Sequence, residues 1–123
     1  MVAKRKADEG KETSDTKCLP NSLMQRIGGP GIVHMKKIVQ TPDLVVTLFE
    51  RNIEFRQIFT DGRPLPDDPN PAWNGYSVGK WDGDTLVVET VAQKDLSTLD
   101  RVGTPHTEQL HVTERWRKVN NGK

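Results

Sequence analysis

Apolar and polar side chains alternate along most of the chain after residue 34. An alternation with a period of two places successive side chains on opposite faces of a β-strand. β-branched and aromatic residues, which pack well on a pleated sheet, are frequent in the same segments. The pattern therefore predicts an all-β protein with strands at about residues 34–40, 44–50, 53–60, 76–81, 84–92 and 108–118.

Two short connections predict how these strands pair. Asp82-Gly83 between two strand-like runs favours a two-residue type I′ hairpin turn, because glycine accepts a positive φ without steric cost. A second tight turn is expected near Arg51-Asn52. The facing pairs that follow are Trp81 with Asp84, Gly79 with Leu86, Ser77 with Val88, Leu48 with Phe55 and Val46 with Gln57.

The remaining segments are too short or too irregular for a long helix. Single helical turns are expected at residues 22–27 and 96–101, and four prolines make residues 61–71 an irregular loop. Because no helix could form a βαβ crossover, every strand pairing is expected to be antiparallel. The charge-rich residues 1–17 predict a disordered tail, which leaves residues 18–123 as a single domain.

A meander of six antiparallel strands curls, whereas a closed small barrel usually needs about eight strands. We therefore expect a small β-barrel of calycin-like outline, which is either partly open or completed by a second chain. Exposed strand edges favour such association, so a homodimer is predicted.

The same alternation assigns side chains to the two faces of each strand. In the last strand it places Glu114 and Trp116 on the apolar face, with Arg115 and Arg117 outside. In the second hairpin Ser77, Gly79 and Trp81 share a face with Asp84, Leu86, Val88 and Thr90. In the first hairpin the predicted inner set is Val46, Leu48, Glu50, Ile53, Phe55, Gln57 and Phe59.

Composition narrows the classes of function. The 123 residues carry 18 basic and 17 acidic side chains, and this balance argues against a dedicated nucleic-acid binder. No apolar run is long enough to span a bilayer, so no membrane partner is expected. The basic residues near the N-terminus precede no apolar stretch of the kind found in a secretory signal, and a cytoplasmic location is predicted for the chain as it stands.

Metal and nucleophile motifs are weak. Cys18, His34, His106 and His111 lack the spacing of a metal site, so no metal and no cofactor are predicted. The string Gly75 to Gly79 matches GxSxG, but it lies inside a strand rather than at a strand-to-helix elbow. Serine-hydrolase chemistry is therefore disfavoured.

Acid–base chemistry is a candidate, because parity directs Glu50 and Glu114 into apolar surroundings, where desolvation would raise a carboxyl pKa. His106 at the mouth of the last strand is a third candidate. The competing interpretation pairs each carboxylate with an arginine such as Arg56, Arg63 or Arg115, and it carries more weight than catalysis.

Aromatic side chains suggest ligand binding. Three tryptophans are many for so short a chain, and aromatic residues commonly line small-molecule cavities. The predicted ligand-binding residues are Trp73, Trp81, Trp116, Phe55, Arg56 and Ser77. The leading hypothesis is a barrel that binds an apolar or aromatic small molecule in its interior or mouth. The alternatives are a cofactor-free hydrolase or isomerase and a module that pairs through its strand edges.

Four segments resemble a family of small, uncharacterised bacterial proteins, mostly from soil bacteria. They are Gln40-Thr41-Pro42 and the runs Ile58 to Pro66, Gly75 to Thr90 and Leu110 to Arg117. The run GYSVGKWDGDTLVVET is the most specific of them. Relatives often carry an export signal before the matching region and a further strand after it. No activity is known for the family, so the resemblance implies a shared fold and no catalytic residues.

Overall fold

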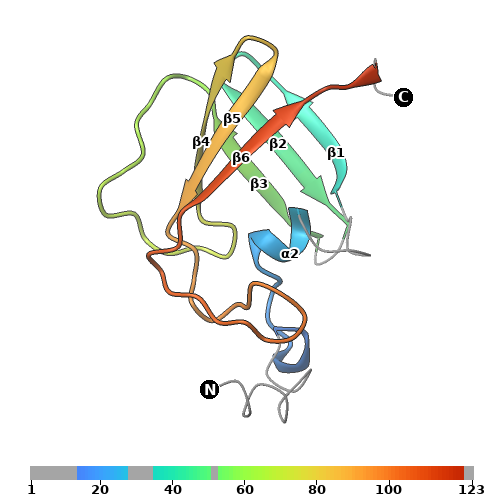
Figure 1. Ribbon diagram of the computed structural model, residues 1–123, viewed down its shortest axis with the longest axis vertical. Helices are drawn as coiled ribbons and strands as arrows, with labels where there is room; N and C mark the ends of the chain where they lie inside the picture. Colours follow the sequence, from blue (N-terminus) through green and yellow to red (C-terminus); the bar gives the residue numbers. More distant parts are fainter. Residues whose placement is uncertain (1–13, 28–34, 51–52, 121–123) are drawn as a thin grey trace.

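The computed structural model describes residues 14–27, 35–50 and 53–120. The chain is all-β, as predicted, and its six strands form one sheet that curls into a half-barrel (Figure 1). The strands are β1 (Met35–Gln40), β2 (Leu44–Phe49), β3 (Phe55–Phe59), β4 (Tyr76–Asp82), β5 (Thr85–Val91) and β6 (Val112–Arg117). Two short helices precede them, η1 (Asp15–Lys17) and α2 (Leu23–Ile27).

The strands lie in the sheet in chain order, from β1 at one edge to β6 at the other. β2 pairs with β3 in the predicted register, with Leu48 opposite Phe55 and Val46 opposite Gln57. The predicted register of the β4–β5 hairpin is wrong, because Asp82 pairs with Thr85 and the turn residues are Gly83-Asp84. The predicted turn type is also wrong: Gly83 has a φ of 62° at the first central position and Asp84 has no positive φ, which fits a type II′ turn and excludes type I′.

One pairing departs from the expected antiparallel pattern. β3 and β4 run parallel and pair at only two positions, Ile58 with Ser77 and Phe59 with Val78. A parallel pair needs a crossover of about a dozen residues or more, and the irregular segment 60–75 supplies it without a helix. This segment leaves the sheet as a wide loop before it returns to β4 (Figure 1). The half-barrel therefore consists of two antiparallel wings, β1–β3 and β4–β6, joined by a short parallel contact.

The predicted inner face is wrong for the first wing. Thr47, Arg56 and Ile58 are buried, whereas Phe55 is 59% exposed and Glu50 is also exposed. Both faces of β2 carry apolar residues, so alternation alone does not orient this wing. In the second wing the predicted inner residues of β5 and β6 are buried or partly buried, but Trp81, at the end of its strand, is 51% exposed.

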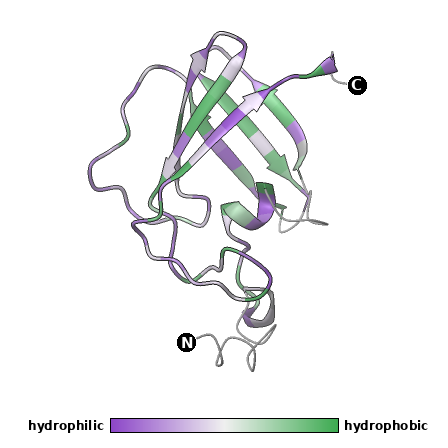
Figure 2. Ribbon diagram, in the orientation of Figure 1, coloured by the Kyte–Doolittle hydropathy of each residue, from purple (hydrophilic) through white to green (hydrophobic). Residues whose placement is uncertain are grey.

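The core lies inside the curl of the sheet. It is formed by Val45, Ile58, Leu86 and Val88, with Trp116 packed against them. Hydrophobic colour is strongest on the strands, and much of the connecting loops is hydrophilic (Figure 2). No helix in residues 14–27, 35–50 and 53–120 is long and apolar enough to cross a membrane.

α2 lies near one end of the curled sheet (Figure 1), and its Leu23 is fully buried. This helix confirms the turn predicted at residues 22–27, whereas the turn predicted at 96–101 is wrong, since that segment forms non-helical turns and bends. Of the predicted tail, residues 1–13 lie outside the described residues. Ser14 is buried, and its hydroxyl accepts a hydrogen bond from the backbone N–H of Thr98 at 3.2 Å.

Two glycines with positive φ provide a test of this packing. Gly75 and Gly83 have φ values of 66° and 62°, so alanine meets backbone strain at both, and what differs in the surroundings is the space for a Cβ. A Cβ at Gly75 would lie 2.5 Å from the Val91 carbonyl oxygen, whereas one at Gly83 meets nothing within 4 Å. We expect Gly75→Ala to lower the free energy of unfolding by about 1–3 kcal/mol more than Gly83→Ala. Urea denaturation of both variants measures the difference, and equal losses would contradict the close approach of β5 to Gly75.

Candidate functional site

A buried arginine crosses the interior of the half-barrel. Arg56 of β3 donates from its two terminal nitrogens to the Glu114 carboxylate of β6, at 3.2 and 2.5 Å. Its Nε donates to Ser77 Oγ at 3.0 Å, and Nη2 also donates to Thr90 Oγ1 at 2.7 Å. The indole N–H of Trp116 donates to the same carboxylate at 3.0 Å. The Arg56 network thus joins β3, β4, β5 and β6.

The charged side chains of the Arg56 network are almost completely buried, and this favours a structural role for them. The side chains of Arg56 and Glu114 are 1% and 7% exposed. A buried charge is tolerated when it is paired and hydrogen-bonded, and both groups meet this condition. The structural interpretation of Glu114, pairing with an arginine, is therefore the one that the geometry supports. Three N–H groups donate to the Glu114 carboxylate, so both of its oxygens already accept hydrogen bonds from within the fold.

A pocket lies where the two wings diverge. β3 and β4 pair only at their two contact positions, and the segment before β4 separates from the start of β3. The resulting groove has a volume of about 440 Å³ and is lined by Glu54, Phe55, Arg56, Gln57, Phe59, Ala72, Trp73, Asn74, Gly75, Tyr76 and Ser77. Asn74 spans its inner end, where the side-chain amide donates to the Phe55 carbonyl oxygen at 3.2 Å and to Glu54 Oε2 at 3.5 Å.

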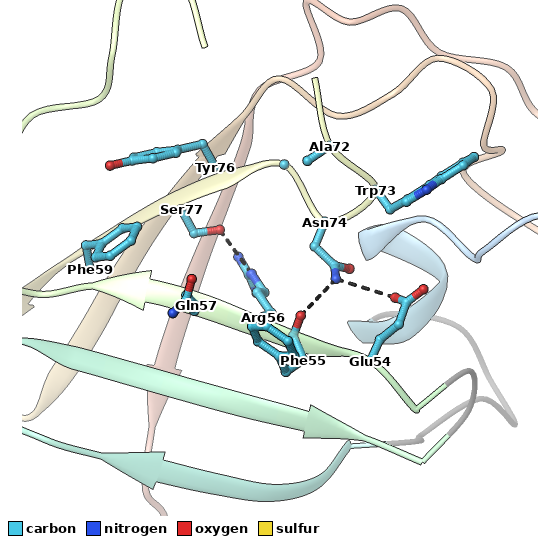
Figure 3. A pocket seen from close by; sticks show the side chains of 11 residues that line it. Glu54, Phe55, Arg56, Gln57, Phe59, Ala72, Trp73, Asn74, Tyr76 and Ser77 are labelled. Carbon is cyan, nitrogen blue, oxygen red and sulfur yellow. Dashed lines mark hydrogen bonds between the residues drawn. The ribbon is translucent and has the colours of Figure 1, made fainter. Parts of the chain in front are cut away.

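Aromatic rings stand at both ends of this groove. Figure 3 shows Phe59 and Tyr76 at one end and Trp73 at the other, with Phe55 on β3 between them. The Phe59 and Tyr76 rings are stacked, with centroids 5.4 Å apart and planes 29° apart. Phe55 is 59% exposed, so its ring is available to an incoming molecule. A planar apolar ligand is the kind that such walls accommodate.

The charged groups around the groove form pairs. Arg26 of α2 forms an ion pair with Glu54, and burial lowers the pKa of Arg26 although the carboxylate opposes this shift. At the other end Asp61 accepts hydrogen bonds from the Arg63 guanidinium, which lower the pKa of Asp61 and raise that of Arg63. The Arg63 guanidinium also lies 3.9 Å from the centroid of the Phe59 ring.

The structure brings together part of the predicted ligand site. Phe55, Arg56, Trp73 and Ser77 all line the groove, with Arg56 and Ser77 hydrogen-bonded at its floor (Figure 3). The other two predicted ligand residues, both tryptophans, lie elsewhere. Trp81 is half-exposed near the β4–β5 turn, and Trp116 packs against the core.

The three predicted acid–base residues are not assembled into one site. Glu50 is exposed after the end of β2, outside the curl, because the face of the first wing is opposite to that predicted. His106 lies in the segment before β6, where its Nδ1 donates to the Thr107 carbonyl oxygen at 2.9 Å. Its Nε2 lies 2.9 Å from Ser97 Oγ, but Ser97 is only 1% exposed. This hydrogen bond ties two parts of the loop between β5 and β6.

Sequence reasoning missed the other groove residues. Phe59, Tyr76 and Asn74 belong to segments that alternation assigns to strands and a loop, and only the crossover of residues 60–75 brings those segments together. The available signal was the aromatic and amide cluster in the run Trp73 to Tyr76. Among residues 14–27, 35–50 and 53–120, no three His, Cys, Asp or Glu side chains are grouped as metal ligands.

Comparisons with protein-family models, curated sequences and solved structures found no match. The resemblance of four segments to a bacterial family stays a prediction, as does the cytoplasmic location.

The Arg56 network can be tested by a double-mutant cycle. Glu114→Leu leaves the Arg56 charge buried without its partner, which should cost about 3–5 kcal/mol of unfolding free energy. Combining it with Arg56→Met should recover most of that loss, because no charge then remains buried. Urea denaturation of the four proteins measures the coupling. Losses that simply add would show that the two side chains act independently.

The exposed Asp61–Arg63 pair provides a control for the same experiment. Asp61→Asn should leave the unfolding midpoint almost unchanged, because exposed ion pairs contribute little to stability. A loss as large as that of Glu114→Leu would mean that burial does not explain the strength of the interior pair.

Proposed function

We propose that this protein binds a small apolar or aromatic molecule in the groove between β3 and the segment that leads into β4. The observation that carries the proposal is the grouping of Phe55, Phe59, Trp73 and Tyr76 around a single pocket. Its volume of about 440 Å³ lies within the usual range of small-molecule sites, about 300–1,000 Å³. The Gln57 and Asn74 amides at its edge are suited to orient a polar substituent.

The groove is a better candidate than the barrel interior that the sequence suggested. The interior is filled by fully buried Ile58 and Val88 and by the paired Arg56 and Glu114. A ligand entering there would have to displace the Arg56 network, at the cost of exposing a buried ion pair. The groove can instead accept a ring without disturbing the core. The acid–base alternative has no comparable support, because its residues lie apart.

A neutral naphthalene derivative tests the proposal directly. We expect 2-naphthol to bind with measurable heat in isothermal titration calorimetry, and Trp73→Ala to weaken that binding by about tenfold, the loss of one stacking wall. Trp81→Ala is the matched control, since Trp81 is half-exposed outside the pocket lining and should leave the affinity unchanged. Equal effects of the two substitutions, or no binding at all, would contradict a ligand site here.

A specific observation also supports the strand-edge hypothesis. β1 is an edge strand with apolar side chains exposed on both faces, Ile38 at 51% and Val39 at 40%. Ile38 pairs with Thr47, whose side chain is buried inside the curl, so Ile38 lies on this same inner face of the sheet, at its edge. We propose that a second copy of the chain pairs with this edge. An antiparallel pairing centred on Ile38 would bring the two isoleucines together and keep the two Lys37 side chains apart.

Light scattering coupled to size-exclusion chromatography tests this second proposal. The wild-type protein should elute as a dimer at micromolar concentration, and Ile38→Glu should shift it to the monomer because two carboxylates would then meet. Leu96→Glu is the control, since Leu96 is 60% exposed in a loop far along the chain from β1. A wild-type monomer, or a dimer unaffected by Ile38→Glu, would rule out pairing through this edge.

A further inference from the structure

One positive charge at the groove differs from the others. The charges that line or flank the pocket are neutralised in pairs: Glu54 by Arg26, Arg56 by Glu114 and Arg63 by Asp61. Lys94 has no such partner among the residues that the structure describes. Its Nζ lies 5.0 Å from the centroid of the Trp73 ring, and within residues 14–27, 35–50 and 53–120 its ammonium makes no ion pair.

The backbone fixes Lys94 beside the groove. Its N–H donates to the Ala72 carbonyl oxygen at 3.0 Å, and the Ala72 N–H donates to the Ala92 carbonyl oxygen at the same distance. A short parallel bridge between Ala72 and Gln93 adds to this contact. The segment after β5 that carries Lys94 is therefore tied to the segment that carries Trp73. Since Lys94 is only partly exposed, its charge is less screened than that of a fully exposed lysine.

We propose that the ligand of this groove is an aromatic carboxylate, a planar apolar ring that bears one negative charge. This inference rests on the proposed function and adds the charge of the ligand to it. The ring would lie against the aromatic walls, and the carboxylate would be directed toward the Trp73 end, where the unpaired ammonium of Lys94 lies. A cationic ligand would be repelled from that end by Lys94, and Glu54, the one carboxylate among the described residues that line the groove, already pairs with Arg26. A neutral ligand would leave the lysine without a counter-charge.

Two probes of the same shape separate the charge from the ring. We expect 2-naphthoate to bind about threefold to tenfold more tightly than 2-naphthamide at low ionic strength, because only the former carries the charge that Lys94 attracts. Lys94→Met should remove this preference while it keeps an unbranched side chain over Trp73, and Lys94→Arg should retain it. Lys80→Met is the matched control, since Lys80 is exposed on β4 outside the pocket lining and should change nothing. Added salt should weaken the binding of 2-naphthoate and leave that of 2-naphthamide unaffected.

The outcomes distinguish the inference from the function on which it rests. If both probes bind with equal affinity, or if Lys94→Met keeps the preference for 2-naphthoate, the carboxylate is not recognised through Lys94 and only this inference fails. If neither probe binds, the proposed function fails and the inference with it. Titration calorimetry gives both affinities, and near-ultraviolet circular dichroism of each variant shows whether the environment of the tryptophans is preserved.

Discussion

A single buried guanidinium links the two wings of this sheet. The wings share only two paired positions through their backbones, so side-chain contacts across the interior must hold them in one curl. Arg56 provides such contacts by reaching from β3 to Ser77, Thr90 and Glu114 on the three strands of the other wing. Each of these groups is buried, and each would be costly to bury without its partners. The network therefore fixes the relative position of the wings as well as contributing to stability.

The groove follows from the same arrangement. Because the parallel contact between β3 and β4 is short, the strands diverge beyond it, and Asn74 bridges the gap with its side chain where a strand would have used backbone atoms. Phe59 of β3 then stacks on Tyr76 at the start of β4, and Trp73 of the returning loop lies at the other end of the groove (Figure 3). The interior pair defines where the wings meet, and the crossover of residues 60–75 defines where they separate. The shape of the groove thus depends on an ion pair in the interior.

Much of the local structure could be predicted from alternation and turn chemistry. All six strands lie within a few residues of their predicted positions, and the inward direction of Glu114 on β6 is confirmed by its burial. The prediction failed where local patterns were ambiguous. β2 is apolar on both faces, so alternation does not decide whether Leu48 or Thr47 faces inward. Thr47 faces inward together with its pairing partner Arg56, a long polar side chain that alternation would place outside. Its partner Glu114 is 58 positions away in the chain, and no local rule connects the two.

The amino-acid sequence by itself determined the strand positions and the apolar face of the second wing, because these depend on neighbours two to four positions apart. Only the tertiary structure decided the inward face of the first wing, the parallel pairing of β3 with β4 and the assembly of the aromatic groove. Each of these requires contacts between segments that are distant in the sequence. A buried charge must find its partner wherever that partner lies in the chain, and this requirement overrides the local alternation of apolar and polar residues.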